Sequence, residues 1–300
     1  MSVPHRIDPM SREESSKPLG LIAGSGRFPM LVLKEASRQG IPMVVAAIKE
    51  EASPQVATCV AEAGEGFALH WIALGQLGKL VRLFKKKGVE KALMAGQVRH
   101  SQIFSPNTPA SRKLLSAMPD LTMLKVLMSL PRKNTESLMR GVVGVLEENG
   151  IQLLDSTLFL KDLMAGSGVL TNREPSTAEW KDIEYGRPIA RQLARLDLGQ
   201  SIVVKDCAVV AAEAMEGTDE TVERAARLVG GQSLTLIKVA RPEQDMRFDV
   251  PVLGLDTLEV LAKCHVTAVA VDEGRTLFLD KQKFIAGADQ LGVSIVSGSR

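Results

Sequence analysis

Short apolar runs of strand length alternate with glycine turns and helical patterns at the start of this chain. Leu19–Ala23 has the composition of a buried strand and ends in Gly24-Ser25-Gly26. Pro29 suits the first turn of a following helix, which the pattern continues to Gly40. Met43–Ile48 is a second apolar run of strand length. This order of elements favours parallel strands joined by helical crossovers.

The same order of helix, strand and glycine turn occurs again further along the chain. Gln76–Lys87 has apolar residues at the i, i+3, i+4 and i+7 positions of an amphipathic helix. Lys91–Ala95 is then a further strand, followed by Gly96. We therefore predict an α/β fold with a Rossmann-like parallel sheet, whose carboxyl edge near Gly24 and Gly96 would bind phosphate groups.

Length, charge and cysteine content narrow the class of protein. At 300 residues the chain has room for about two domains. The 37 Lys and Arg residues against 35 Asp and Glu give a net charge of +2, so no basic excess indicates a nucleic-acid partner. Three widely spaced cysteines, without a CxxC pair, disfavour a disulfide framework and a zinc site and favour the reducing cytosol. No apolar run approaches the roughly 20 residues of a membrane-spanning helix.

The polarity of the chain predicts three segments. Residues 1–18 lack the apolar core of a signal peptide, so we expect a disordered leader there. Residues 19–149 would form the Rossmann-like domain with a linker helix at its end, and residues 150–300 a C-terminal domain. Because that second half mixes hairpins and helices, we expect it to be mixed α+β.

Two local patterns organise the C-terminal domain. Ser176-Thr-Ala-Glu179 is a capping box that opens a long helix. Ser201–Lys205 and Ala208–Ala212 are β-rich runs separated by Asp206-Cys207, which predicts a hairpin.

The Gly24-Ser25-Gly26 turn has two interpretations. A dinucleotide fingerprint needs a third glycine three residues after the second, and Pro29 occupies that position. The alternative is a tight strand-to-helix turn that needs a positive φ. The residues alone leave both open.

Glu216-Gly217-Thr218-Asp219 stands at a strand-to-helix junction. Thr218 can cap the helix and Asp219 can complement its positive end, which is a complete structural explanation. The same geometry suits a ligand, because a helix N-terminus attracts phosphate and a carboxylate there holds Mg²⁺ or orients water.

A second charged cluster begins at Lys238. If Gln244–Val250 is extended, alternation places Asp245, Arg247 and Asp249 on one face and apolar residues on the other. These charges form either a surface ladder or a site in which two carboxylates hold a metal while Lys238 and Arg247 neutralise a diphosphate.

In their order and spacing, these motifs resemble the LpxI-type UDP-2,3-diacylglucosamine pyrophosphatases of bacterial lipid A synthesis. The likeness begins at Leu19 and extends over nearly the whole chain. The pieces that carry it are Ala23-Gly-Ser-Gly26 with Pro29, Gly75-Gln76, Ala95-Gly96, Asp197-Leu-Gly-Gln200, Glu216-Gly-Thr-Asp219, the cluster from Lys238 to Asp249, Gly254 and Thr257.

The resemblance implies Mg²⁺-dependent hydrolysis of UDP-2,3-diacylglucosamine to UMP and 2,3-diacylglucosamine 1-phosphate (lipid X). It ties catalysis to Asp219, adds Glu216, Lys238, Asp245 and Arg247 as catalytic candidates, and makes Asp219 and Asp245 metal ligands. The substrate-binding candidates that it implies are Gly24, Ser25, Gly26, Gln76, Gly96, Gly199, Gln200, Thr218 and Gln244.

The resemblance also implies a cytoplasmic homodimer. Acyl chains need an apolar groove, for which the Met and Leu residues of 118–130 are candidates, and this predicts peripheral contact with the inner membrane. The chain departs from the family at Lys133-Asn134-Thr135, where relatives carry a carboxylate. That departure keeps a non-catalytic UDP-sugar-binding protein as an alternative, and the first glycine turn keeps an NAD(P)-dependent oxidoreductase as another.

Overall fold

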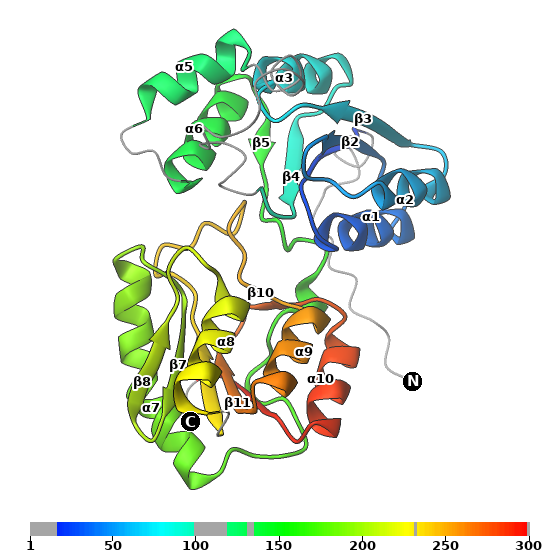
Figure 1. Ribbon diagram of the computed structural model, residues 1–300. Coiled ribbons are helices and arrows are strands. Elements are labelled where there is room, and N and C mark those ends of the chain that lie inside the picture. The colour runs from blue at the N-terminus through cyan, green and yellow to red at the C-terminus, as the bar shows by residue number, and fades with distance from the viewer. Residues whose placement is uncertain (1–16, 99–118, 131–134, 231–232, 299–300) are drawn as a thin grey trace. The chain divides into compact units, whose positions relative to one another are not determined.

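The computed structural model describes residues 17–98, 119–130, 135–230 and 233–298 (Figure 1). The chain divides into two compact units, residues 1–159 and 160–300. Apart from its last two residues, the leader expected at 1–18 lies outside the described residues, as do Lys133 and Asn134. The boundary expected near Gly150 precedes the short strand β5, which pairs with β4 in the first unit.

The first unit contains a five-stranded parallel sheet in the order β3-β2-β1-β4-β5. β2 and then β3 lie on one side of β1, whereas β4 and then β5 lie on its other side. Between β1 and β4 lies a topological switch point, where the following loops diverge and ligands bind in such sheets. The strands are β1 Leu19–Ala23, β2 Met43–Ile48, β3 Phe67–Ile72, β4 Lys91–Ala95 and β5 Gln152–Leu153.

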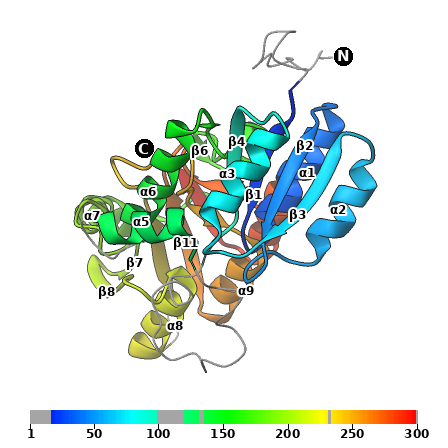
Figure 2. The same cartoon turned by 90° about the horizontal axis from the view of Figure 1, so that it is seen from above.

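Helices cover both faces of this sheet. α1 and α2 pack against each other on one face, and α3 lies on the other with α5 and α6 beside it (Figures 1 and 2). Pro29 lies in the first turn of α1, as predicted. The bounds are α1 Phe28–Arg38, α2 Gln55–Ala63, α3 Leu77–Lys86, α5 Leu121–Ser129 and α6 Thr135–Glu148.

The second unit contains a six-stranded mixed sheet in the order β6-β13-β11-β9-β7-β8. β9, β11 and β13 are parallel, and β7 runs antiparallel to β9. The predicted hairpin of β7 and β8 is confirmed, and Asp206 and Cys207 both take positive φ at its tip. The strands are β6 Gly168–Val169, β7 Ser201–Lys205, β8 Ala208–Ala212, β9 Leu234–Lys238, β11 Val266–Val271 and β13 Ser294–Ser297, with β10 Val252–Leu253 and β12 Leu277–Phe278 paired separately.

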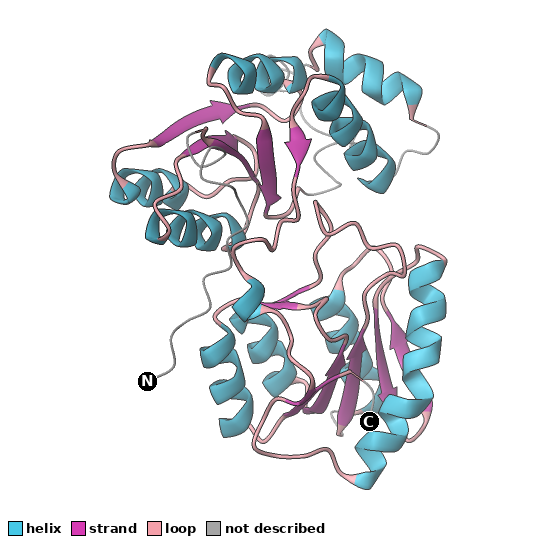
Figure 3. Cartoon of the chain, turned by 180° about the vertical axis from the view of Figure 1, so that it is seen from behind, coloured by secondary structure: helices cyan, strands magenta, loops and turns pink. Residues whose placement is uncertain are grey.

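This sheet lies between two helical layers (Figures 1 and 3). Ile183 and Ala190 of α7 pack on one face, against Ile202 and Ile237. α8, α9 and α10 pack on the other face. The predicted capping box is present at the start of α7. The bounds are α7 Thr177–Arg195, α8 Thr218–Val229, α9 Leu255–Lys263 and α10 Lys281–Gln290, with a 3₁₀ turn at Lys161–Leu163.

The expected fold class, a Rossmann-like parallel sheet followed by a mixed α/β unit, is therefore confirmed. Among the described residues, no helix is long and apolar enough to cross a bilayer.

Candidate active site

The N-terminus of α8 lies at the carboxyl end of β9. Gly217 precedes the helix at φ 90° and has no side chain with which to cap it, so the first-turn amide groups carry partial positive charge. Because β7 is antiparallel to β9, its first residue, Ser201, pairs with Lys238 at the end of β9. Residues from three elements thus meet at one edge of the second sheet.

Thr218 Oγ1 is the centre of a hydrogen-bond network at this edge. Lys238 Nζ donates to it at 2.7 Å, Ser201 Oγ lies 2.9 Å away and Glu213 Oε1 lies 3.1 Å away. A hydroxyl has one proton and two acceptor lone pairs, so Thr218 gives its proton to Glu213 and accepts from Lys238 and Ser201. The prediction that Thr218 caps α8 is wrong, because its hydroxyl is engaged in this network and Gly217 is the N-cap residue.

Glu213 connects the network to the Gly199-Gln200 turn. Its second carboxylate oxygen, Oε2, accepts a hydrogen bond from Gln200 N at 3.0 Å. A Cβ atom on Gly199 would lie 2.1 Å from the Glu213 carbonyl oxygen, so only glycine fits there. The candidate positions Gly199 and Gln200 are therefore adjacent to the α8 terminus.

Lys238 and Asp219 place buried charged atoms at this edge of the sheet. Lys238 is only 9% exposed, and burial lowers the pKa of its ammonium group while the carboxylates of Glu213, Asp219 and Asp249 raise it. Asp219 Oδ1 is buried and has no hydrogen-bond partner. An unpartnered buried carboxylate oxygen costs stability, and a bound cation or water would offset that cost.

Glu216 supports the turn that leads into α8. Its carboxylate accepts hydrogen bonds from Arg224 at 2.6 Å, Thr221 at 3.2 Å and Ala214 N at 3.1 Å. The pKa of Glu216 is lowered, first by a hydrogen bond from its own backbone N–H and then by Arg224. These contacts stabilise the turn that precedes Asp219.

The segment Gln244–Val250 is not extended, so the predicted alternation of charged and apolar faces is wrong. Phe248 N and Asp249 N both donate to the Asp245 carbonyl, at 3.1 and 2.9 Å, and close a turn. Gln244 bridges the segment, accepting from Arg241 N and donating to Asp249 O, each at 2.7 Å. These local side-chain contacts replace a strand ladder.

Asp245 and Arg247 form an ion pair within this turn. Arg247 Nη2 donates to Asp245 Oδ2 at 2.8 Å, and Nε donates to Oδ1 at 2.9 Å. Both carboxylate oxygens of Asp245 thus already accept hydrogen bonds from Arg247.

The described residues contain no group of three His, Cys, Asp or Glu side chains that could hold a metal ion. Mg²⁺ often uses only one or two carboxylates, completed by water and substrate phosphates. On that basis the residues fit Mg²⁺, because Asp219 offers a buried oxygen without a donor.

The two glycine turns of the first unit lie side by side at the switch point. Ser25 and Gln97 form an antiparallel bridge, and Ser25 Oγ donates to Gln97 O at 2.8 Å. A Cβ atom on Gly24 would lie 2.6 Å from Gln97 O, and one on Gly96, at φ +90°, would lie 2.3 Å from Ser25 O. Packing thus explains Gly24 and Gly96, and only Gly26 of the first turn has the expected positive φ.

Gln76 is the N-cap residue of α3 in the same unit. Its Oε1 accepts a hydrogen bond from Ala73 N at 3.3 Å and closes the turn before the helix.

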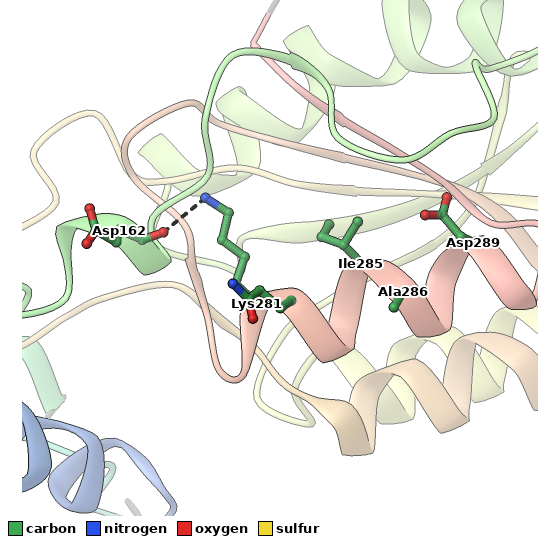
Figure 4. Close-up of a pocket in the computed structure, with 6 residues that line it drawn as sticks. Asp162, Lys281, Ile285, Ala286 and Asp289 are labelled. Atoms are coloured by element: carbon green, nitrogen blue, oxygen red, sulfur yellow. Dashed lines mark hydrogen bonds between the residues drawn. The ribbon is translucent and has the colours of Figure 1, made fainter. Parts of the chain in front are cut away.

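A pocket of about 480 Å³ lies along α10 in the second unit (Figure 4). Lys281 donates there to the Asp162 and Met164 carbonyls at 3.1 and 2.6 Å, and Asp289 accepts from Asn172. None of the predicted site residues lines this pocket.

Both units match the domains of one known protein family. The LpxI N-terminal domain matches residues 18–163, and the LpxI C-terminal domain matches residues 166–296. The chain belongs to the LpxI family. The UDP-2,3-diacylglucosamine pyrophosphatase LpxI of Caulobacter vibrioides is 29% identical over 289 residues, which cover 93% of this chain and 96% of that protein.

Among solved structures, a putative fructose-1,6-biphosphate aldolase from Coccidioides immitis aligns with 95% of this chain and 77% of its own, at 13% identity. Its TM-score of 0.19 is too low to indicate a common fold with this LpxI-family chain.

Sequence reasoning missed Glu213 and Ser201, which contact Thr218 in the candidate site. The predicted hairpin could have indicated both residues, because its strands pair Ile202 with Ala212. That register places Ser201 and Glu213 next to each other, and Glu213 N indeed donates to Ser201 O at 2.9 Å.

Proposed function

We propose that this chain is a UDP-2,3-diacylglucosamine pyrophosphatase of lipid A synthesis. Water adds to a phosphorus of the diphosphate, the bridging P–O bond breaks, and UMP and 2,3-diacylglucosamine 1-phosphate leave. The observation that carries the proposal is the unpartnered Asp219 Oδ1 in the field of the buried Lys238 ammonium. Membership of the LpxI family, and the activity named for the Caulobacter relative, support the same reaction.

The roles of the residues follow from their charge and position. The Lys238 ammonium and the first-turn amides of α8 would bind phosphate oxygens, which lowers the repulsion met by an attacking water. Asp219 would hold Mg²⁺ or orient that water. Bound Mg²⁺ would supply Lewis-acid stabilisation of the phosphate charge. Arg247 stays a phosphate-binding candidate that is paired with Asp245.

The glycine turns of the first unit are proposed to contribute substrate contacts. They occupy the switch point of the sheet, where open α/β sheets bind their ligands. A Cβ atom on Gly26 would meet nothing within 4 Å, so the backbone there is open to a ligand.

A cytoplasmic homodimer that touches the inner membrane from one side is proposed with this function. Leu121 and Met128 of α5 are 78% and 80% exposed, and Leu124 is 43% exposed. Exposed apolar side chains on one helix suit acyl chains or a lipid surface. Co-sedimentation with anionic lipid vesicles should fall when Leu121 and Met128 are both changed to Ser, and unchanged co-sedimentation would reject this contact.

The experiment that tests the function is UMP release. The purified chain is incubated with UDP-2,3-diacylglucosamine in detergent micelles, with Mg²⁺ or with EDTA. UMP formed only with the metal ion would establish the hydrolase and its cofactor. UMP formed equally in EDTA would reject the metal requirement.

Binding of the same substrate without UMP release would instead favour the non-catalytic UDP-sugar-binding protein. A change in NAD(P)H absorbance without UMP release would favour the oxidoreductase.

A further inference from the structure

We propose that Glu213 is a positioning residue that fixes the Lys238 ammonium at the N-terminus of α8 through the Thr218 hydroxyl. The inference rests on the proposed function, since it concerns how the phosphate-binding cation is held. Neither the family motifs nor the charge clusters of the sequence include Glu213.

The geometry assigns a direction to each hydrogen bond. An ionised carboxylate only accepts, so Glu213 Oε1 takes the single Thr218 proton at 3.1 Å. Both lone pairs of Thr218 Oγ1 then remain for Lys238 Nζ at 2.7 Å and Ser201 Oγ at 2.9 Å. Glu213 thereby makes the hydroxyl an acceptor for the ammonium.

A glutamine at position 213 cannot reproduce this arrangement. The native carboxylate accepts twice, from Thr218 at one oxygen and from Gln200 N at the other. A glutamine side chain has one oxygen and one NH₂ group. If the NH₂ group faced Thr218, the hydroxyl would lose its acceptor at position 213 and would turn its proton to Ser201 instead, and if it faced Gln200 N, two donors would oppose each other.

The backbone of Glu213 is itself held by the hairpin. Glu213 N donates to Ser201 O at 2.9 Å, directly beyond the paired residues Ile202 and Ala212. The Glu213 carbonyl also packs closely on Gly199, where a Cβ atom would lie 2.1 Å from the carbonyl oxygen. The carboxylate is therefore placed by the sheet, as a group that orients a catalytic side chain must be.

The electrostatic balance supports the same role. Lys238 is buried, which disfavours its charged form, and Glu213 is among the carboxylates that favour it. Among the described residues, Thr218 is the hydrogen-bond partner of Lys238 Nζ. An ammonium has three protons, so the cation held in this way keeps donors for phosphate oxygens.

A double-mutant cycle with Lys238 tests the inference. Glu213→Gln, Lys238→Met and the double variant are assayed for kcat and KM by UMP release. We expect Glu213→Gln to lower kcat by about 10-fold or more with KM less affected, because the cation acts most on the charge of the transition state. In the Lys238→Met background the same change should alter kcat by less than about 2-fold.

A matched control is Glu223→Gln, which removes a carboxylate of α8 that pairs with Lys263. This control should leave kcat unchanged. Thermal unfolding reports whether each variant is folded, and Thr218→Val replaces Glu213→Gln in the cycle if the latter does not fold.

Three results would overturn the inference. Wild-type activity in Glu213→Gln would show that the carboxylate has no part in the reaction. Equal losses in the native and Lys238→Met backgrounds would show that Glu213 does not act through Lys238. An inactive wild-type chain would reject the proposed function itself, and this inference with it.

Discussion

Lys238 Nζ lies 2.7 Å from Thr218 Oγ1, although 20 residues separate the two in the sequence. The contact brings a buried cation to the positive end of α8. Two sources of positive potential at one point create a site for a multiply charged anion. When no anion is bound, the carboxylates of Glu213 and Asp219 balance this positive charge. The predictions below start from this arrangement and from the packing around it.

Changing Asp219 to Asn should abolish most activity and leave the fold intact. We expect a fall in kcat of about 100-fold or more, since a neutral amide is a poor metal ligand and a poor acceptor of a water proton. The buried Oδ1 has no donor to lose, so the midpoint of thermal unfolding should change little. UMP release and thermal unfolding measure the two effects.

Asp256→Asn is the matched control for this change. Asp256 occupies the same first-turn position of α9 that Asp219 occupies in α8, so both variants lose a similar helix-dipole interaction. Asp256→Asn should retain wild-type activity. Comparable losses in both variants would count against a catalytic role for Asp219.

Replacing Thr218 by Val should destabilise the second unit. The change removes one hydroxyl and with it the hydrogen bonds that Lys238 Nζ, Ser201 Oγ and Glu213 Oε1 make to that hydroxyl. We expect a loss of about 1–3 kcal/mol in the free energy of unfolding, measured by urea denaturation. Thr218→Ser keeps the hydroxyl and should be close to wild type, so equal stability of the Val and Ser variants would contradict the network.

The Glu179 carboxyl should make stability depend on pH under acidic conditions. Burial opposes its ionisation, but hydrogen bonds from Arg173, Thr267 and Ser176 N prevail and lower its pKa from the usual 4.5 to about 2. A carboxyl with a lowered pKa stabilises the fold above its unfolded pKa and loses that contribution as the pH falls. The loss should therefore occur between about pH 4.5 and pH 2.

Urea denaturation at pH 7 and pH 3 of the wild type and of Glu179→Gln tests this contribution. The variant should be less stable at pH 7 by on the order of 2 kcal/mol, and the difference should narrow at pH 3. Glu184→Gln changes an exposed glutamate of the same helix and should have little effect at either pH. An unchanged difference at pH 3 would show that the ion pair with Arg173 does not set the pKa.

Changing Gly96 to Ala should destabilise the first unit. The new Cβ atom would lie 2.3 Å from Ser25 O, and the backbone at φ +90° disfavours any side chain. We expect a loss of more than about 1 kcal/mol in the free energy of unfolding. Gly144→Ala in α6 meets nothing within 4 Å and should instead stabilise by about 0.5–1 kcal/mol. Equal effects of the two changes would show that the turns do not pack as described.

Strand positions were predictable wherever a run was apolar throughout. Leu19–Ala23 and Met43–Ile48 match the structure residue for residue, because strands buried on both faces carry continuous apolar runs. β3 was missed, since Phe67–Ile72 is a half-buried edge strand that includes His70 and has no such run.

The extended form expected for Gln244–Val250 shows the limit of periodicity. Alternating charged and apolar residues are a strand pattern only when a neighbouring strand offers hydrogen bonds. Here Gln244 satisfies the backbone of Arg241 and Asp249 locally, and the chain turns.

The sequence by itself determined the family, the fold class and the motif residues, because those are carried by local runs and by their order. Only the tertiary structure decided which side chains meet. Glu213, Thr218 and Lys238 come from a loop, a helix start and a strand end, and sheet pairing brings them within hydrogen-bond distance. The pairing of Asp245 with Arg247 and the unpartnered oxygen of Asp219 were likewise invisible in the sequence, since each depends on which groups lie nearby after folding.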